Sequence, residues 1–535
     1  MTMKHFYTTF MWLALTAEAF AASLTYDFHD DLTCTLMRAD ASGDVVLPAV
    51  VSRDGVDYTL TTIGAEAFMD SRVTSVSLPA TITAAGEDAF RRCDYMTRVV
   101  VPSVEAWLGI TFANEYASPL AGYHPLYIGD EPLTRLTVPA GEAVLKPYAF
   151  FNCSSLQTAD LSGVTSIGEH CFDGCENLSS VVLAPGLQYV GDWAFNICRE
   201  LTSIDLPAGV TYLGQGTFYG CSELSSIKLP DDIQVIPALC FAGCLSIGTL
   251  DFVPASVIGV GDYAFYFCTG LQTAHFSESV RMYGDFVFYD CESLRSVSMP
   301  CAGASLGEFM FADCYSLTSV ELPAGIKSIP RGLFFECNSL ESVELPPTLE
   351  LIDEYAFGDC HSLKYIAFPQ GLRQIGDRAF YGCWTVRRLE FPASMESIGA
   401  ETFYLCYAIE QIHVRSVTPF NISFFSFDWQ ADRQAQVFVP AASLELYRSD
   451  TYGWANFDNL VGLEEYNPDT VLSISWGDAA VSRPVAYGTR LTLTVARIDG
   501  SRPARVTFNG QSLDVAADNT VTTPVITAAS SLVIE

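Results

Sequence analysis

The stretch Leu363–Cys383 has the sequence Leu-Lys-Tyr-Ile-Ala-Phe-Pro-Gln-Gly-Leu-Arg-Gln-Ile-Gly-Asp-Arg-Ala-Phe-Tyr-Gly-Cys, and it returns along most of the chain. A fixed period in the twenties that carries L-x-x-(V/I)-x-(L/F)-P once per unit is typical of a leucine-rich-repeat solenoid. The sequence therefore predicts a β-rich solenoid, a right-handed coil of 23-residue repeats. The phenylalanine before Tyr-Gly-Cys marks the period, with a spacing of 23 residues and once of 24, at Phe172, Phe195, Phe218, Phe241, Phe265, Phe288, Phe311, Phe334, Phe357, Phe380 and Phe403.

One repeat suggests how a single coil is built. Ile366 and Phe368 lie two residues apart, so on a strand both side chains point to the same face. Pro369 then ends the pairing because it has no N–H to donate. At Gly376 the chain is expected to turn tightly without a Cβ penalty. The acid that follows, Asp377 in this repeat, is expected to cap a short Ala-Phe helical turn.

Stacking is required because no single coil can bury its own apolar residues, and it joins them into one continuous core. The chain has 535 residues, of which 50% are hydrophobic and 17% charged, so a disordered chain is excluded.

The net charge is −34, with 62 acidic and 28 basic residues. Such a surface repels nucleic acid and anionic lipid, and it suits a cationic partner.

Cysteine is unusually frequent, with 17 residues, and most of them lie three positions after the repeated phenylalanine. One thiol per coil predicts a column of buried small apolar side chains. Disulfides and a metal site are the alternatives, but parallel side chains in a column are poorly aimed for bridging. The acidic column offers calcium ligands, although capping explains it without an ion. No cofactor is expected.

The pattern divides the chain into five parts. Residues 1–22 join Lys4 to a short apolar run and Ala19-Phe20-Ala21, which predicts a secretory signal peptide. No later apolar run is long enough for a membrane helix. We expect an N-terminal cap at 23–62, the repeats at 63–413, a C-terminal cap at 414–463 and a small β-sandwich-like module at 471–535. An irregular segment at 103–145 interrupts the repeats and is either a functional insertion or an inert bulge.

The motif I-G-x-x-A-F-x-x-C-x-x-L-x-x-V-x-L-P, as at 190–207 and 375–392, resembles the BspA-like leucine-rich-repeat proteins of bacterial surfaces. The C-terminal part, with Asn509-Gly510, is similar to bacterial immunoglobulin-like or internalin-B-repeat-like modules. The resemblance implies a secreted or surface-displayed binding protein, in some members an adhesin for matrix proteins or other cells. It carries over no catalytic residue.

Enzyme motifs give little support for catalysis. Gly303-Ala-Ser-Leu-Gly307 matches G-x-S-x-G, but a nucleophile elbow needs a strand before it and a long helix after it. Here Leu306-Gly307 occupies the Ile-Gly position of its coil. The seven histidines are scattered without metal-ligand spacing. We therefore do not expect an enzyme.

The predicted site is the outward face of the stacked strands, because solenoids bind through such extended faces. We expect this face to recognise a protein or matrix component of a host or neighbouring cell, or a glycan, and we expect the protein to be a monomer. The alternative is a glycan-binding or structural spacer protein of the cell surface. His275 and His413 are expected to be exposed to solvent, and Tyr365, Arg387 and Arg388 are the expected hot spot. The candidate residues are Asp251, His275, Glu321, Glu344, Tyr365, Arg387, Arg388, Glu390 and His413.

Overall fold

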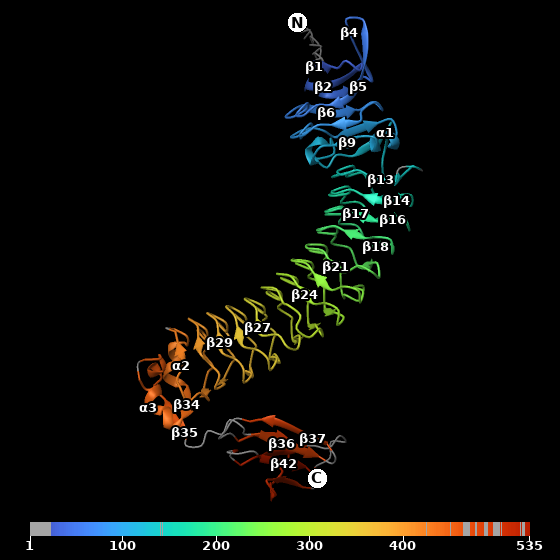
Figure 1. Ribbon diagram of the computed structural model, residues 1–535. Helices are drawn as coiled ribbons and strands as arrows, with labels where there is room; N and C mark the ends of the chain where they lie inside the picture. The colour runs from blue at the N-terminus through green and yellow to red at the C-terminus, as the bar shows by residue number, and fades with distance from the viewer. Residues whose placement is uncertain are drawn as a thin grey trace, which may run out of the picture. The chain divides into compact units, whose positions relative to one another are not determined.

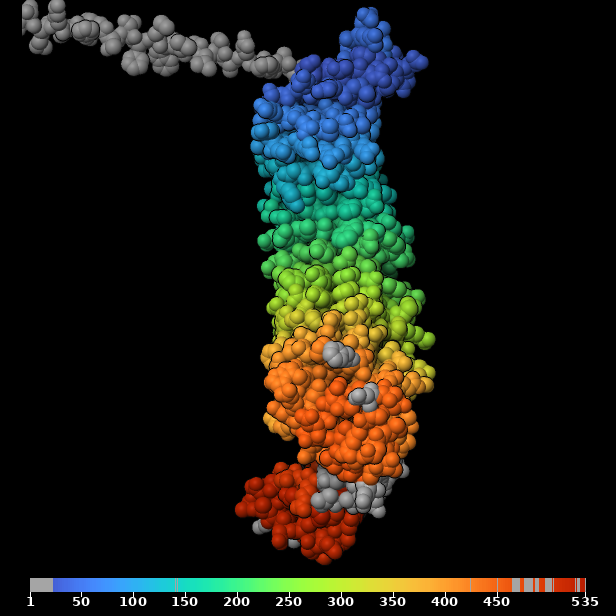
Figure 2. All heavy atoms as spheres, turned by 90° about the vertical axis from the view of Figure 1, so that its left-hand side faces the viewer, coloured from blue at the N-terminus to red at the C-terminus, as the bar shows by residue number. Residues whose placement is uncertain are grey.

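The computed structural model describes residues 23–139, 141, 143–423, 425–449, 451–463, 471–476, 479–485, 490–495, 503, 505–524, 526 and 530–534. The predicted signal peptide at 1–22 lies outside these residues. The chain forms two compact units, Met1–Gly248 with Phe252–Ser256 (unit 1) and Thr249–Asp251 with Val257–Glu535 (unit 2). Both contain stacked coils of short strands, as Figure 1 shows, so the predicted β-solenoid with 23-residue spacing is confirmed. In Figure 2 the successive coils of each unit appear as bands of colour.

Most regular coils contribute to two parallel ladders, each divided into several hydrogen-bonded sheets. The first ladder comprises the strands of the L-x-x-(V/I)-x-(L/F) segment, and the second comprises short strands, most of them of two residues, that end at the Ile position of Ile-Gly. In unit 1 the first ladder contains β3 (Ser42–Val46), β6 (Arg72–Ser77), β8 (Arg98–Val101), β10 (Leu126–Ile128), β12 (Arg135–Thr137), β14 (Thr158–Leu161), β16 (Ser180–Leu183), β18 (Ser203–Asp205) and β20 (Ser226–Lys228). Its second ladder contains β5 (Val56–Ile63), β7 (Ala84–Ala85), β9 (Thr111–Phe112), β13 (Val144–Leu145), β15 (Ser166–Ile167), β17 (Tyr189–Val190), β19 (Tyr212–Leu213) and β21 (Val235–Ile236).

Unit 2 repeats the arrangement. Its first ladder contains β23 (Thr273–His275), β25 (Ser296–Ser298), β26 (Ser319–Glu321), β30 (Arg388–Phe391), β32 (Gln411–Val414), β34 (Gln436–Pro440) and β35 (Leu460–Leu463). Its second ladder contains β22 (Gly259–Val260), β24 (Met282–Tyr283), β27 (Ser328–Ile329), β28 (Leu351–Ile352), β29 (Gln374–Ile375), β31 (Ser397–Ile398) and β33 (Asn421–Ile422). In-register pairs such as Gln374 with Ser397 stack equivalent positions directly on one another.

The phenylalanines form the core of each unit. Phe172 stacks on Phe195 with ring centroids 5.3 Å apart, and Phe288 stacks on Phe311 at 5.6 Å. These four side chains are 0% exposed. The period that marks the repeat in the sequence therefore also aligns the aromatic rings in one row per unit, where they support each other from coil to coil.

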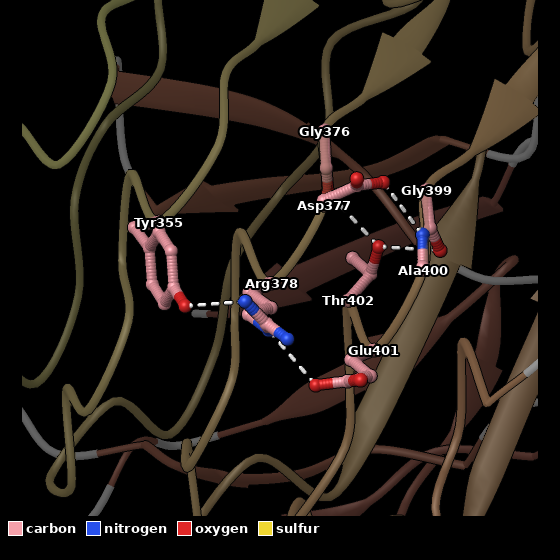
Figure 3. A network of polar contacts seen from close by, with 8 residues as sticks. All are labelled: Tyr355, Gly376, Asp377, Arg378, Gly399, Ala400, Glu401 and Thr402. Carbon is pink, nitrogen blue, oxygen red and sulfur yellow. Dashed lines mark hydrogen bonds and ion pairs between the residues drawn. The ribbon is translucent and has the colours of Figure 1, made fainter.

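Coils are also joined by polar contacts, and for these the sequence analysis predicted the wrong hydrogen-bond partners. The carboxylate after Ile-Gly was expected to cap its own turn, but Asp377 Oδ1 accepts from the N–H of Ala400 in the next coil at 2.7 Å (Figure 3). The residues Ala379 and Phe380 form a turn without a helix. Beside it, Arg378 donates to Tyr355 in the preceding coil and to Glu401 in the following one, each at 2.8 Å. Polar side chains of this edge thus connect coils.

Glycine at the Ile-Gly position has a different role from the predicted tight turn. Gly376 does not have a positive φ. A Cβ built there would lie 2.7 Å from the backbone nitrogen of Glu354, closer than side-chain carbons approach backbone. Its N–H donates to the carbonyl oxygen of Ile352 at 2.7 Å. This glycine is required because neighbouring coils approach closely.

Both ends of the repeat array carry other structure. At the N-terminal end β1 (Ser23–Phe28) pairs antiparallel with β2 (Thr33–Asp40), and β4 (Val50–Arg53) pairs antiparallel with β5. The irregular segment includes α1 (Val104–Leu108), η1 (Glu115–Ala117) and β11 (Glu131–Pro132). Trp107 is 1% exposed and donates to Ala149 O at 2.7 Å, so this segment fills the core. After the last coils follow α2 (Trp429–Gln434), η2 (Ala441–Ser443), α3 (Leu444–Tyr447) and η3 (Trp454–Asn456).

The C-terminal region is all-β where the structure describes it. Its core includes Leu472, Val506, Phe508 and Leu532, and the likeness to an immunoglobulin-like module stays a prediction. One sheet has the order β37-β36-β42-β39-β40 and another joins β38 to β41. The strands are β36 (Val471–Trp476), β37 (Ala479–Pro484), β38 (Thr492–Thr494), β39 (Val506–Phe508), β40 (Gln511–Ser512), β41 (Thr520–Thr522) and β42 (Ser530–Ile534).

The 17 cysteines form no disulfide in the part of the chain that the structure describes, and every one except Cys301 is buried. The expected column of buried small side chains is therefore confirmed, with one addition. Cys291 Sγ donates to Phe265 O at 3.1 Å and Cys314 Sγ donates to Phe288 O at 3.2 Å. Burial raises the pKa of both thiols. The thiols therefore satisfy backbone carbonyls between coils and are poor nucleophiles.

We predict that a thiol reagent such as Ellman's reagent reacts rapidly with one cysteine of the native protein. Cys301 is the half-buried thiol, and reaction of the others has to await unfolding. Counting fast and slow thiols by absorbance tests this, with Cys301→Ser as the control that removes the fast phase. Rapid reaction of several thiols in native buffer would contradict the buried column.

Candidate functional site

The first ladder of unit 2 is interrupted in the middle of the predicted face. β26 ends at Glu321, and the next strand of this ladder, β30, begins at Arg388. The intervening segments at 342–345 and 365–368 are fully described, yet neither forms a paired strand. The prediction of a regular strand in the quoted repeat is therefore wrong.

Two adjacent hollows occupy this interruption. The first has a volume of about 500 Å³ and the second about 630 Å³. Ala367 stands at the outward position where neighbouring coils carry Glu344 and Glu390, so a short side chain leaves space between two long ones. We call this region the open wall and define it by the residues Glu321, Ser342, Glu344, Tyr365, Ala367, Gln370 and Glu390.

Tyr365 is the aromatic residue of the open wall. Its side chain is 54% exposed. Burial of its other part and the carboxylate of Glu390 raise the pKa of Tyr365, so its hydroxyl stays protonated. Glu321 and Glu344 are exposed on the same wall, and Glu321 accepts from Ser298 at 2.6 Å. An aromatic ring between carboxylates is suited to a cationic side chain, which gains from both the ring and the charge.

The expected cations next to Tyr365 are engaged in ion pairs. Arg387 donates to Glu410 at 2.9 Å, and both side chains are well exposed, so this pair contributes about 1 kcal/mol or less. Arg388 lies 3.8 Å from Glu390. Glu390 also accepts from Arg415 Nε at 2.8 Å. The structure thus brings Arg388 and Glu390 together, but as one ion cluster whose positive charge is partly neutralised.

Sequence reasoning missed Arg415, whose side chain is only 8% exposed. The sequence did contain a signal. In the preceding coil Pro392 follows the strand, and Arg415 stands at the equivalent position. Its guanidinium reaches back to Glu390 and lines the 630 Å³ hollow. Arg415 therefore fixes one wall of that hollow.

His413 was expected to be exposed and is instead 4% exposed. The reason is the cap strand β34, in which Phe438 pairs with His413 and stacks on its ring at 4.5 Å. Neither ring nitrogen has a hydrogen-bond partner among the described residues. Burial, with Arg388 and Arg415 nearby, lowers the pKa of His413 to about 3. It is a neutral packing residue and offers no exposed surface.

Of the other two candidates, His275 lies on β23 of the same ladder, whereas Asp251 lies in a turn outside any strand. His275 is exposed, as expected, and pairs in register with Ser298. Asp251 is exposed and accepts from Thr249 Oγ1 at 2.8 Å. Neither lines a hollow of the open wall.

The structure also shows where the serine of the G-x-S-x-G string and the possible metal ligands lie. Ser305 lies at the second ladder, where it forms a bridge with Met282 and its hydroxyl donates to Arg281 O at 3.4 Å. Within the part of the chain that the structure describes, no three His, Cys, Asp or Glu side chains gather in a way that would hold a metal ion. The same residues contain no helix that is long and apolar enough to cross a bilayer.

Comparison with known proteins agrees with the fold. The family model described as "BspA type Leucine rich repeat region" matches residues 56–115, 143–254, 252–346 and 327–430. These segments include more than half of the chain. Proteins with this type of repeat are typically bacterial surface proteins, and their fold is in general not enzymatic. No curated protein matches the chain.

Solved leucine-rich-repeat proteins are similar to this chain at low identity. One from Bacteroides ovatus is 23% identical, with 78% of this chain and 98% of that one covered and a TM-score of 0.48. A leucine rich cell surface protein from Faecalibacterium prausnitzii is 22% identical, with coverages of 73% and 93% and a TM-score of 0.43. On the match of the repeat model, the chain belongs to the family of proteins with a BspA type leucine rich repeat region.

Proposed function

We propose that this protein is secreted or displayed on a bacterial surface and binds a protein or extracellular-matrix component through the open wall. The observation that carries the proposal is the pair of adjacent hollows of about 500 and 630 Å³, the larger of them lined by Tyr365, where the first ladder lacks strand pairing. An extended segment of a partner can use backbone groups at such an interruption and place alternate side chains in the hollows.

The charge of the wall favours a basic segment in that partner. Glu321 and Glu344 are exposed along it, and the whole chain has a net charge of −34. Complementary charge speeds association and rejects acidic partners. A lysine or arginine of the partner fits between Tyr365 and Glu344 in this arrangement.

We predict that Tyr365→Ala weakens binding to the matching matrix protein at least tenfold, because an exposed aromatic residue at the centre of an interface is a typical hot spot. The measurement is biolayer interferometry of the full-length protein against a panel of purified extracellular-matrix proteins. Tyr95→Ala is the matched control, since Tyr95 is 59% exposed and Tyr365 54%.

The same panel decides between this function and a rigid spacer without a ligand. Saturable binding that Tyr365→Ala weakens and Tyr95→Ala leaves unchanged supports the open wall. Absence of saturable binding across the panel, or equal loss in both variants, would reject it. Arg387→Ala should change affinity little, because its exposed pair with Glu410 stays solvated.

A further inference from the structure

Two tyrosines are exposed side by side on the second ladder of unit 1. Tyr189 and Tyr212 are 40% and 44% exposed, and their rings stack at 4.7 Å with an angle of 7° between the planes. Tyr212 donates its hydroxyl to Asp192 Oδ1 at 2.9 Å. This hydrogen bond, with burial, raises the pKa of Tyr212 to about 12 and fixes the ring. One face of Tyr212 is covered by Tyr189, and the opposite face is directed toward the next coil.

That next coil does not pair with Tyr212. The sheet β13-β15-β17-β19 ends at β19, and β21 is not part of it. Within this sheet the Ile-Gly glycine of each following coil donates its N–H to the strand before it, as Gly214 does to Val190 O at 2.9 Å. Pro237 takes this position in the coil of β21, and it has no N–H to give to Leu213. The second ladder is therefore broken by a proline.

Other coils support this cause. In unit 2 a second proline, Pro330, takes the same position, and its strand β27 again stands first in its sheet. Asp353 also replaces the glycine but keeps an N–H, which donates to Ile329 O at 3.0 Å, and there the ladder continues. The coils around Pro237 stay joined on both sides, by the pairing of β18 with β20 and by Gly216 N–H to Ala238 O at 2.9 Å.

The gap opened by Pro237 is a pocket of about 770 Å³. This volume lies within the range of about 300 to 1,000 Å³ that is typical of small-molecule sites. Tyr212 and the exposed Val235, at the equivalent position of the next coil, line it, and Val210, Leu213 and Pro237 are its other apolar residues. The polar rim consists of Asp192, Thr211, Gln215, Asp232 and Gln234.

We propose that this pocket binds a neutral saccharide ring, stacked on the free face of Tyr212 with its hydroxyl groups on the rim. A sugar ring has an apolar C–H face and a circle of hydroxyls, and the pocket offers an aromatic face surrounded by side-chain oxygens and amides. Asp192 and Asp232 disfavour uronic and sialic acids by charge repulsion. The site lies on the second ladder and does not depend on the open wall.

The test is ligand-observed NMR and isothermal titration calorimetry of the full-length protein with methyl glycosides of common hexoses, N-acetylhexosamines and glucuronate. We expect one or more neutral saccharides to bind, and glucuronate to bind at least tenfold more weakly. Tyr212→Ala should weaken binding of the neutral saccharide at least tenfold. Tyr212→Phe keeps the stacking face and should retain most of the affinity. Tyr365→Ala, a substitution in the open wall, should leave the affinity for the saccharide unchanged.

A second variant tests the pocket without removing the tyrosine. Pro237→Gly restores the N–H and removes the ring, so the ladder should close, protect the amide of residue 237 from hydrogen exchange and weaken saccharide binding at least tenfold. Failure of every neutral saccharide to bind would overturn the proposal. So would unchanged affinity in Tyr212→Ala, equal binding of glucuronate, or unchanged binding in a Pro237→Gly variant whose ladder has closed.

Discussion

Replacing Phe288 by alanine is expected to lower the free energy of unfolding by about 3 to 5 kcal/mol. Phe288 is 0% exposed and its ring lies between those of Phe265 and Phe311, each 5.6 Å away. Truncation removes contacts on both sides and leaves a cavity between coils that are held in place by their other neighbours. Urea unfolding followed by far-UV circular dichroism measures the loss.

The position of the substituted ring distinguishes the loss of stacking in the core from a general effect of removing any aromatic side chain. Phe267→Ala is the matched control, because Phe267 belongs to a neighbouring coil of the same unit but is 41% exposed. Phe267→Ala should lower the free energy of unfolding by less than about 1 kcal/mol. Because each coil contacts only its neighbours, hydrogen exchange in Phe288→Ala should rise most in the adjacent coils. A loss below about 1 kcal/mol for Phe288→Ala would show that the aromatic row is not the core.

The core could be predicted from the sequence because it depends on periodicity alone. A phenylalanine every 23 residues requires that equivalent positions be stacked, and the rows of rings at Phe172 and Phe288 follow from this requirement. Burial of the cysteines follows in the same way, since they share the period. What repeats in the sequence is repeated in space, so a single repeat predicts many contacts.

Contacts between coils could not be predicted in the same way. Arg378 has φ of +54°, a conformation that favours glycine, and sequence reasoning gave it no special backbone. Its N–H donates to Ala400 O in the next coil at 2.9 Å, and this bond offsets the local cost. The bond from Asp377 to Ala400 has the same character. Local rules assign such groups to their own turn, whereas the stacked fold offers partners one repeat away.

The candidate site shows the same division. The outward positions of Tyr365 and Glu344 follow from alternation along a strand, and both are exposed. The interruption that opens the wall does not follow, because the segment at 365–368 keeps the motif and still lacks pairing. His413 also keeps the outward position, yet a cap residue outside the repeat, Phe438, covers it. Departures from the repeat arise where its neighbours differ.

Asp432 in α2 is expected to make the C-terminal cap more stable at acidic than at neutral pH. Burial, together with the carboxylates of Asp428 and Asp458, raises the pKa of Asp432 from 3.8 to about 6. A carboxyl group with a raised pKa in the folded state stabilises that state only while it is protonated. Its contribution is therefore complete below about pH 4 and is lost as the pH rises through 6. Discounted for partial exposure, the loss amounts to about 2 kcal/mol.

Asp432→Asn keeps the shape of the side chain and removes the charge, so it should stabilise the cap by about 2 kcal/mol at pH 7.5 and by close to zero at pH 4. Hydrogen exchange of peptides from 428–458, followed at both pH values after correction for the intrinsic rate, measures the difference. Asp231→Asn removes the same charge from an exposed position and should leave these peptides unchanged. Equal protection in the Asp432→Asn and unmodified proteins at pH 7.5 would mean that the three carboxylates do not repel one another in the folded cap.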